Sequence, residues 1–168
     1  MRPVGLFLFA CVFTAELWVP SRSWADWSVV RKSRAQGKIF CVLESERQPI
    51  FDGYQDSSVF VVVSEGGIIV KSESCLDSEF QDVGFIVDDK RLLKMDEVHD
   101  RRTGVFKHSY DQIIEALQGG SELNVQLRFW PEWPTTGVHR ATFSLRGFPE
   151  AYAEVGNCRP TSPPGEAH

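Results

Sequence analysis

Residues 122–130, ELNVQLRFW, alternate strictly between polar and apolar side chains. Successive side chains of a β-strand point to opposite faces, so this alternation predicts a half-buried antiparallel strand. The side chains predicted to face inward are Leu123, Val125, Leu127 and Phe129, and those predicted to face outward are Asn124, Gln126, Arg128 and Trp130. The proline-containing stretch 131–137 should turn the chain into a partner strand at residues 138–145, which completes a hairpin.

Two more hairpins are predicted on the N-terminal side of this one. Residues 58–64 and 68–71 are β-branched runs separated by a glycine-containing turn at 65–67. Two such runs around such a turn are typical of a β-hairpin. Residues 83–87 and 92–98 flank a charged turn in the same way, and they predict a further hairpin.

The N-terminal part of the chain predicts two additional strands and a long loop. Apolar and β-branched runs at residues 26–30 and 38–44 favour strands. Residues 46–57 contain Pro49 and the pair Asp52-Gly53, and these residue types favour turns. We therefore expect a loop there, although a loop of this length is unusual in a compact domain.

Two short helices are expected, at residues 109–118 and 148–156. Ser109 can cap the first helix, and Gly119 and Gly120 can end it. Its apolar stripe consists of Ile113, Ile114 and Leu117. Pro149 suits the first turn of the second helix. Together these patterns give about eight short strands and two short helices.

The order of these elements indicates the fold class. Strand follows strand without helical crossovers, so the sheets should be mostly antiparallel. We predict an antiparallel β-sandwich in a single domain over residues 26–158. The proline-rich stretch 159–168 is expected to be a disordered tail.

The first 25 residues have the pattern of a cleaved signal peptide. Arg2 precedes an uncharged run at residues 5–15, and Ser23 and Ala25 supply the small residues of a cleavage site. The apolar run is too short to cross a membrane, which takes about 20 residues. We therefore expect cleavage after Ala25 and export to the periplasm or the cell surface, with no integral membrane segment in the mature chain.

Composition and charge exclude several classes of protein. With 42% hydrophobic and 24% charged residues, the chain does not resemble a disordered or fibrous protein. Its formal net charge is −5. An acidic protein does not suit a phosphate backbone, which favours clusters of Lys and Arg, so we expect no nucleic-acid partner. No motif indicates a cofactor.

Three cysteines follow the predicted cleavage site, namely Cys41, Cys75 and Cys158. In an oxidising compartment, two of them should form a disulfide and one should remain unpaired. The pair Cys41–Cys158 would close the longest loop and constrain the unfolded chain most strongly. The pair Cys75–Cys158 is the alternative, because both residues lie in loop-like sequence, and the sequence alone does not choose between them.

The C-terminal third is similar to a known family of exported bacterial proteins. Residues 143–152, FSLRGFPEAY, follow the predicted hairpin and resemble the hallmark segment of the invasion-associated locus B family. The start of the mature chain, DWSV at 26–29 followed by Cys41, also resembles that family. The cysteine pair that its members commonly carry before the central helix is missing at residues 103–107. The resemblance implies a periplasmic or cell-surface β-sandwich, associated in some pathogens with host-cell invasion, and no known catalytic residues.

The sequence gives little indication of catalysis. His99 is followed by Asp100, and His108 precedes Asp111, but neither pair has the spacing of a metal site or a general base. There is no Gly-x-Ser-x-Gly elbow and no phosphate-binding loop. We therefore expect a protein that is not an enzyme. A hydrolase is the less favoured alternative, and it would need a cleft where a histidine and two carboxylates converge.

The turn between residues 129 and 134, FWPEWP, is the best candidate for recognition. Trp130 should point outward, and Trp133 lies between two prolines that stiffen the turn. Two exposed indoles suit stacking on sugar rings or anchoring in a protein groove, whereas indoles folded back on the sheet would be structural. We expect an exported protein that acts by non-covalent interaction with an envelope protein or glycan. A carbohydrate-binding module is the alternative.

Overall fold

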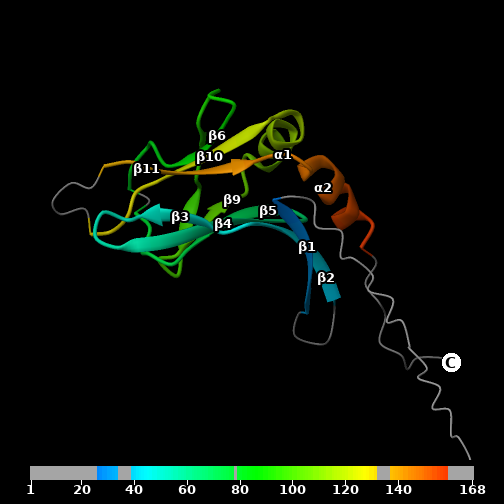
Figure 1. Cartoon of the computed structure of the whole chain (residues 1–168), viewed down its shortest axis with the longest axis horizontal. Coiled ribbons are helices and arrows are strands. Elements are labelled where there is room, and N and C mark those ends of the chain that lie inside the picture. Colours follow the sequence, from blue (N-terminus) through cyan, green and yellow to red (C-terminus); the bar gives the residue numbers. More distant parts are fainter. Residues whose placement is uncertain (1–25, 34–38, 78, 132–136, 159–168) are drawn as a thin grey trace, which may run out of the picture.

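The computed structural model describes residues 26–33, 39–77, 79–131 and 137–158. Within them the chain forms eleven strands and two helices (Figure 1). The strands are β1 (Trp27–Ser33), β2 (Ile39–Ser45), β3 (Gln48–Phe51), β4 (Asp56–Ser64), β5 (Gly67–Ser72), β6 (Gly84–Val87), β7 (Leu93–Lys94), β8 (Glu97–His99), β9 (Thr103–Phe106), β10 (Glu122–Leu127) and β11 (His139–Ser144). The helices are α1 (Tyr110–Gly119) and α2 (Phe148–Gly156).

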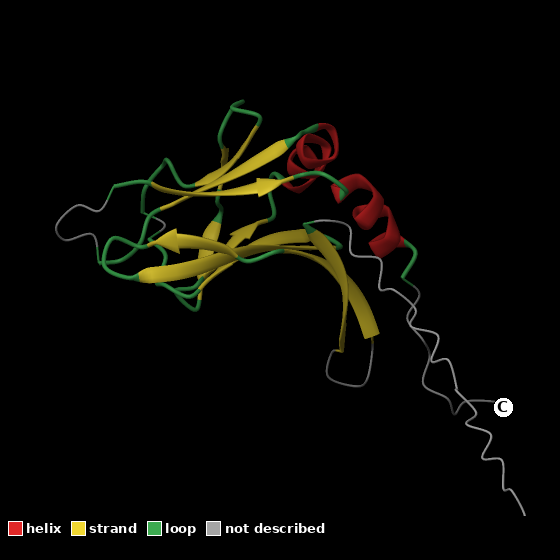
Figure 2. Ribbon diagram, in the orientation of Figure 1, coloured by secondary structure: helices red, strands yellow, loops and turns green. Residues whose placement is uncertain are grey.

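The strands form two antiparallel sheets that pack face to face (Figure 2). The larger sheet has the order β1-β2-β4-β5-β9-β8, with β3 paired to β4 beside that path. The smaller sheet has the order β11-β10-β6-β7. This arrangement confirms the predicted class, a mainly β, sandwich-like fold with two short helices. The strands are more numerous than the sequence indicated.

The hairpin predicted from the alternating stretch is confirmed. β10 pairs with β11 in a register that sets Leu123 opposite Phe143 and Val125 opposite Ala141, and all four side chains are buried. The predicted hairpin of residues 58–64 and 68–71 is also present, as β4 and β5.

Two expectations about strands were wrong. The predicted loop at residues 46–57 contains β3, which pairs with β4 and has no second neighbour among the described strands. Pro49 fits there because an edge strand leaves one row of N–H positions unused. The segment predicted to pair with residues 83–87, residues 92–98, also does not form a single strand. β7 pairs with β6, whereas β8 leaves the small sheet and pairs with β9 in the large one.

Two side chains predicted to face solvent are covered instead. Gln126 is 8% exposed, and its amide donates to the Asp82 carbonyl oxygen (2.6 Å). Arg128 is half-buried and bonds both carboxylate oxygens of Asp82, while its guanidinium lies 4.4 Å over the ring of Phe80. The cause is tertiary, because the segment that carries Phe80 and Asp82 folds over the outer face of β10.

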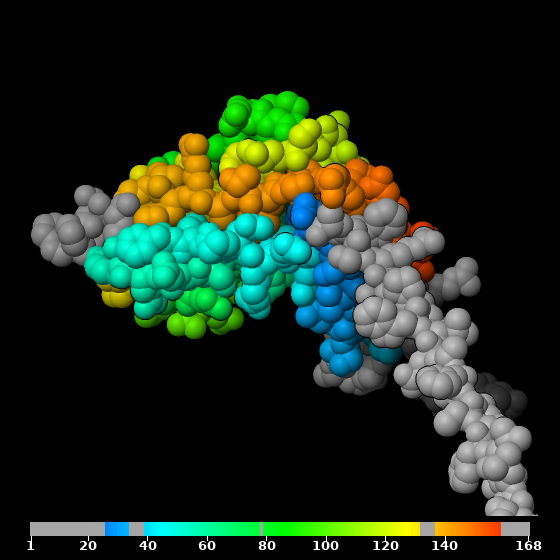
Figure 3. All heavy atoms as spheres, viewed as in Figure 1, coloured from blue at the N-terminus to red at the C-terminus, as the bar shows by residue number. Residues whose placement is uncertain are grey.

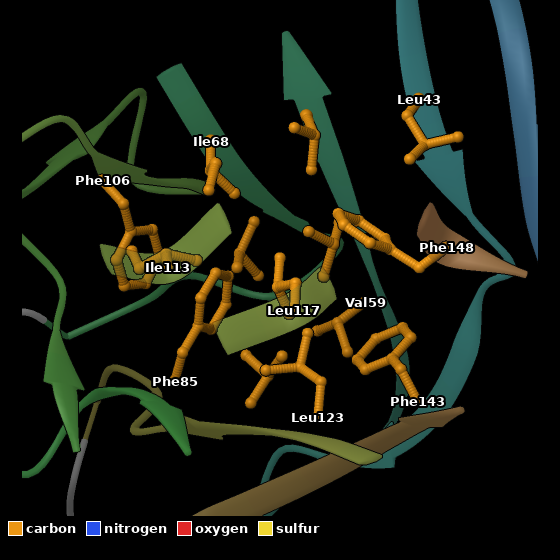
Figure 4. Close-up of a cluster of buried hydrophobic side chains, with 14 of the residues drawn as sticks. Leu43, Val59, Ile68, Phe85, Phe106, Ile113, Leu117, Leu123, Phe143 and Phe148 are labelled. Carbon is orange, nitrogen blue, oxygen red and sulfur yellow. The ribbon is translucent and has the colours of Figure 1, made fainter. Parts of the chain in front are cut away.

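The core lies between the two sheets and includes the buried side chains of α1 (Figure 4). Phe85 of the small sheet stacks on Phe106 of the large sheet, with ring centroids 4.1 Å apart. The predicted stripe of α1 is buried, as Ile113, Ile114 and Leu117. Ser109 precedes α1 as predicted, but its side chain makes no capping hydrogen bond.

Helix α2 closes one end of the sandwich, and a single glycine starts it. Gly147 has a φ of 83°, in the left-handed region that L side chains rarely adopt. The turn places Phe148 edge-on against Trp27, with ring centroids 4.9 Å apart. The indole of Trp27 donates to the Ser144 carbonyl oxygen (2.8 Å), which ties β1 to the end of β11.

The structure joins Cys41 of β2 to Cys158, just after α2, in a disulfide that spans 117 residues of sequence. Of the pairings considered, this is the one that closes the longest loop, and Cys75 is free. No helix in the described part of the chain is long and apolar enough to cross a membrane. The predicted signal peptide at 1–25 and tail at 159–168 lie outside the described residues.

We expect Cys158→Ser to lower the free energy of unfolding by about 4–5 kcal/mol, because the unfolded chain would regain the freedom of a very long loop. Cys75→Ser is the matched control and should change it by less than about 0.5 kcal/mol. Urea denaturation of the oxidised proteins measures both. Equal losses in the two variants would contradict the assigned pairing.

Candidate binding site

The candidate site is built on the segment that crosses from one sheet to the other, residues 73–77, which we call the crossing segment. Its backbone is bonded on both sides. The Leu76 N–H donates to the Arg101 carbonyl oxygen (2.7 Å), and the Cys75 carbonyl oxygen accepts from the Trp130 N–H (2.9 Å). The Asp77 N–H donates to the Arg128 carbonyl oxygen (2.8 Å). The crossing segment therefore lies between the β8–β9 turn and the end of β10.

A surface hollow of about 380 Å³ opens beside the crossing segment. Its lining consists of Cys75, Leu76, Asp77, Glu79, Arg101 and Trp130. Trp130 is 60% exposed, whereas its neighbour Phe129 is 2% exposed and belongs to the core. The alternation of β10 thus continues past its last residue and presents the indole at the hollow.

The charged groups of the hollow are mixed in sign. Arg101 is exposed, and within the described residues its guanidinium has no hydrogen-bonding or ion-pair partner in the structure. The Asp77 carboxylate accepts one hydrogen bond, from the Glu79 N–H (3.0 Å), and the Glu79 side chain is exposed. Residues that carry an indole, a guanidinium and two carboxylates therefore line one hollow, and together they can supply a stacking face with both donors and acceptors.

A second group of exposed rings lies at the end of β3 and on the turn that follows it. Phe51 is 53% exposed and Tyr54 is 52% exposed, although the Asp52 carboxylate between them is buried. Asp52 Oδ1 accepts from the N–H groups of Tyr54 and Gln55, both at 2.8 Å. Asp52 Oδ2 accepts from Ser74 Oγ (2.5 Å), so this turn is bonded to the crossing segment.

These hydrogen bonds also set the protonation of Asp52. Burial by itself would raise the pKa of this carboxyl. The hydrogen bonds from the Ser74 hydroxyl and from the Gln55 and Tyr54 backbone together outweigh burial and hold the pKa below its usual value. Asp52 is therefore ionised, and its hydrogen bond with Ser74 connects the β3–β4 turn to the crossing segment. We call this pair of side chains, Asp52 and Ser74, the brace.

The exposed apolar side chains gather at one end of the molecule. The large hydrophobic residues that are exposed in the described structure are Phe51, Tyr54, Trp130 and Val138. Trp130 and Val138 flank the β10–β11 connection, and β3 lies against β11. β3 runs toward the end from which β11 starts, opposite the end covered by the helices (Figure 1). We call these four residues the aromatic end, and β3 with the turn that follows it forms part of that end in the space-filling view (Figure 3).

Of the two tryptophans predicted to bind a ligand, the structure describes one. Trp130 points outward, as the alternation indicated, while Trp133 lies outside the described residues. Cys75, the alternative disulfide partner, instead lines the hollow. Sequence reasoning missed Tyr54 and Arg101 as neighbours of this surface. The pair Asp52-Gly53 marked Tyr54 only as a position in a turn, and Arg101 lies in the charged sequence HDRRT at residues 99–103.

The histidines considered for catalysis lie beside carboxylates other than Asp100 and Asp111. His99 Nε2 lies 3.0 Å from Glu97 Oε1, and His108 Nδ1 lies 3.0 Å from Asp96 Oδ1. Both imidazoles are exposed. His139 packs against the ring of Phe129. In the part of the chain that the structure describes, no group of three or more His, Cys, Asp or Glu side chains is placed to hold a metal ion.

No protein-family model matches the chain, no curated protein matches it, and no solved structure matches its fold. The function is therefore inferred from the geometry of the aromatic end and from the patterns in the sequence.

We expect Asp52→Asn to lower the free energy of unfolding at pH 7 by about 1.5 kcal/mol, because the buried brace loses a charged acceptor. The folded-state pKa of Asp52 is depressed, so its ionised form stabilises the fold above the unfolded-state pKa of about 3.9. That contribution is lost as the pH falls through the folded-state value. The difference between wild type and variant should thus shrink below about pH 4, as measured by urea denaturation from pH 7 to pH 2.5.

Ser74→Ala removes the hydroxyl that donates to Asp52, and it serves as the companion variant. The double variant should lose less stability than the sum of the two single losses, since both changes break the same bond. Strictly additive losses would show that the two side chains do not form one brace.

Proposed function

We propose that this chain is an exported protein of the bacterial cell envelope that acts by non-covalent binding through the aromatic end. One observation carries the proposal, namely that Trp130 is 60% exposed at the rim of a hollow that is also lined by Arg101, an exposed residue whose guanidinium has no partner among the described residues. A large apolar ring held in water beside convergent polar groups is the usual form of a binding site.

The cell compartment is inferred from two independent features. The first 25 residues have the pattern of a cleaved signal peptide, and disulfides such as Cys41–Cys158 form and persist in oxidising compartments. The resemblance to the invasion-associated locus B family supports the same location. It also makes association with a host cell the biological setting that we propose for the binding.

Binding of carbohydrate is the second candidate function, and the lining of the hollow favours it. A pyranose ring has an apolar face that stacks on an indole, and its hydroxyl groups both donate and accept hydrogen bonds. Asp77 and Glu79 supply acceptors and Arg101 supplies donors next to Trp130. A protein partner would use the same ring as an anchor, and the two candidates differ in the ligand that competes for the site.

We expect Trp130→Ala to weaken attachment of the mature protein to an isolated bacterial envelope fraction at least about tenfold, because a central exposed ring is the residue type that dominates binding. Co-sedimentation at several protein concentrations measures the affinity. Trp130→Phe keeps a ring and should retain most of the binding. Because the side chain is exposed, neither change should unfold the protein, and unchanged affinity in Trp130→Ala would remove the basis of the proposal.

Arg101→Gly tests the polar part of the hollow without disturbing the fold. Arg101 has a φ of 56°, which glycine adopts freely, so the variant loses the guanidinium while its backbone gains an easier conformation. We expect binding about tenfold weaker and stability unchanged or slightly higher. Asp89→Gly makes the same backbone change at a φ of 55° in the turn after β6 and should leave binding unchanged. Equal effects of the two variants would assign the loss to the backbone.

A further inference from the structure

The aromatic end presents two groups of exposed rings rather than one. Trp130 borders the hollow, Phe51 is the last residue of β3, and Tyr54 lies on the β3–β4 turn. Their sequence separation gives no reason for them to lie together. The crossing segment brings them together, because Ser74 is bonded to Asp52 of that turn and the next residue, Cys75, is bonded to Trp130.

The relation between the two groups is fixed by bonds that are buried or made by backbone. Ser74 is 6% exposed, and its hydroxyl reaches both Asp52 Oδ2 and Ser57 Oγ (2.8 Å). The Ser74 N–H is held in turn by the Ser72 hydroxyl (3.1 Å). The two groups of rings are therefore attached to consecutive residues of one hydrogen-bonded segment, and a ligand that spans them loses little free energy to ordering of the protein.

The charges near the rings restrict the class of ligand. An anionic ligand would meet Asp77 and Glu79, and a cationic one would meet Arg101. An anionic lipid surface is disfavoured for the same reason, and also because the whole chain has a net charge of −5. A neutral, hydroxyl-rich ring satisfies both kinds of group, since each hydroxyl can donate to a carboxylate and accept from a guanidinium.

We propose that the aromatic end binds a polysaccharide chain of the cell envelope, with one sugar in the Trp130 hollow and a later sugar of the same chain against Tyr54 and Phe51. This inference rests on the proposed function and adds the ligand class and a second subsite. A single sugar reaches only one group of rings. A chain that reaches both makes its second contact at high effective concentration, so its affinity must rise with chain length.

The test is isothermal titration calorimetry of the mature protein with neutral β-1,4-linked oligomers of N-acetylglucosamine and of glucose. The oligomers range in length from one to eight sugars. Sedimentation with isolated murein sacculi accompanies it. In the wild type, affinity should rise about tenfold or more from the shortest bound oligomer to the longest. Tyr54→Ala should abolish that rise and leave the affinity for the shortest oligomer unchanged. Tyr54→Phe keeps the ring and should preserve the rise, and Trp130→Ala should weaken every oligomer.

Three other results are possible, and each would contradict one part of the proposal. Binding that depends on Trp130 but is the same for all chain lengths, or that ignores Tyr54→Ala, overturns the second subsite and leaves the Trp130 site in place. No binding to any oligomer or to sacculi, with attachment to the envelope fraction still lost in Trp130→Ala, overturns the polysaccharide and leaves a protein partner. Attachment that is unaffected by Trp130→Ala overturns the proposed function as well.

Discussion

The hydrogen bonding of the crossing segment, residues 73–77, is the constraint on which the candidate site depends. The chain must pass from the large sheet to the small one between β5 and β6, and its backbone polar groups must find partners on the way. They find them on the β8–β9 turn and on the end of β10, while Ser74 reaches Asp52 on a third element. The crossing segment thus connects Arg101, Trp130 and Asp52, which lie far apart in the sequence.

The two ends of the sandwich have different roles. The helices cover one end (Figure 1), where Trp27 packs against Phe148 and the disulfide pins the segment after α2 to β2. That end is closed by buried rings and a covalent bond. The opposite end keeps Phe51, Tyr54, Trp130 and Val138 in contact with water. Exposed apolar area of this kind does not stabilise the fold. This exposure, together with the hydrogen-bonded backbone beneath it, is why we propose this end as a binding surface.

The sequence predicted one residue of this candidate site among those that the structure describes, namely Trp130. The outward direction of Trp130 followed from the alternation of residues 122–130, because the period of a strand does not depend on what surrounds it. Arg101 and Tyr54 could be recognised only as turn residues. Their neighbours are set by long-range hydrogen bonds to the crossing segment, which has no periodic pattern of its own. The role of Trp133 stays a prediction, since that residue lies outside the described part of the chain.

Local sequence patterns were sufficient to predict the elements whose signal lies within a few consecutive residues. These are the β4–β5 and β10–β11 hairpins, the buried stripe of α1, and the glycine at which α2 begins, because side-chain period and positive φ are properties of a few consecutive residues. Tertiary structure alone decided which strands share a sheet. β8 joins β9 rather than β6, and Pro49 lies in an edge strand rather than a loop. It also covered Gln126 with the segment that carries Asp82. Such choices depend on the total burial and hydrogen bonding that distant segments achieve together, and no short stretch of sequence contains that information.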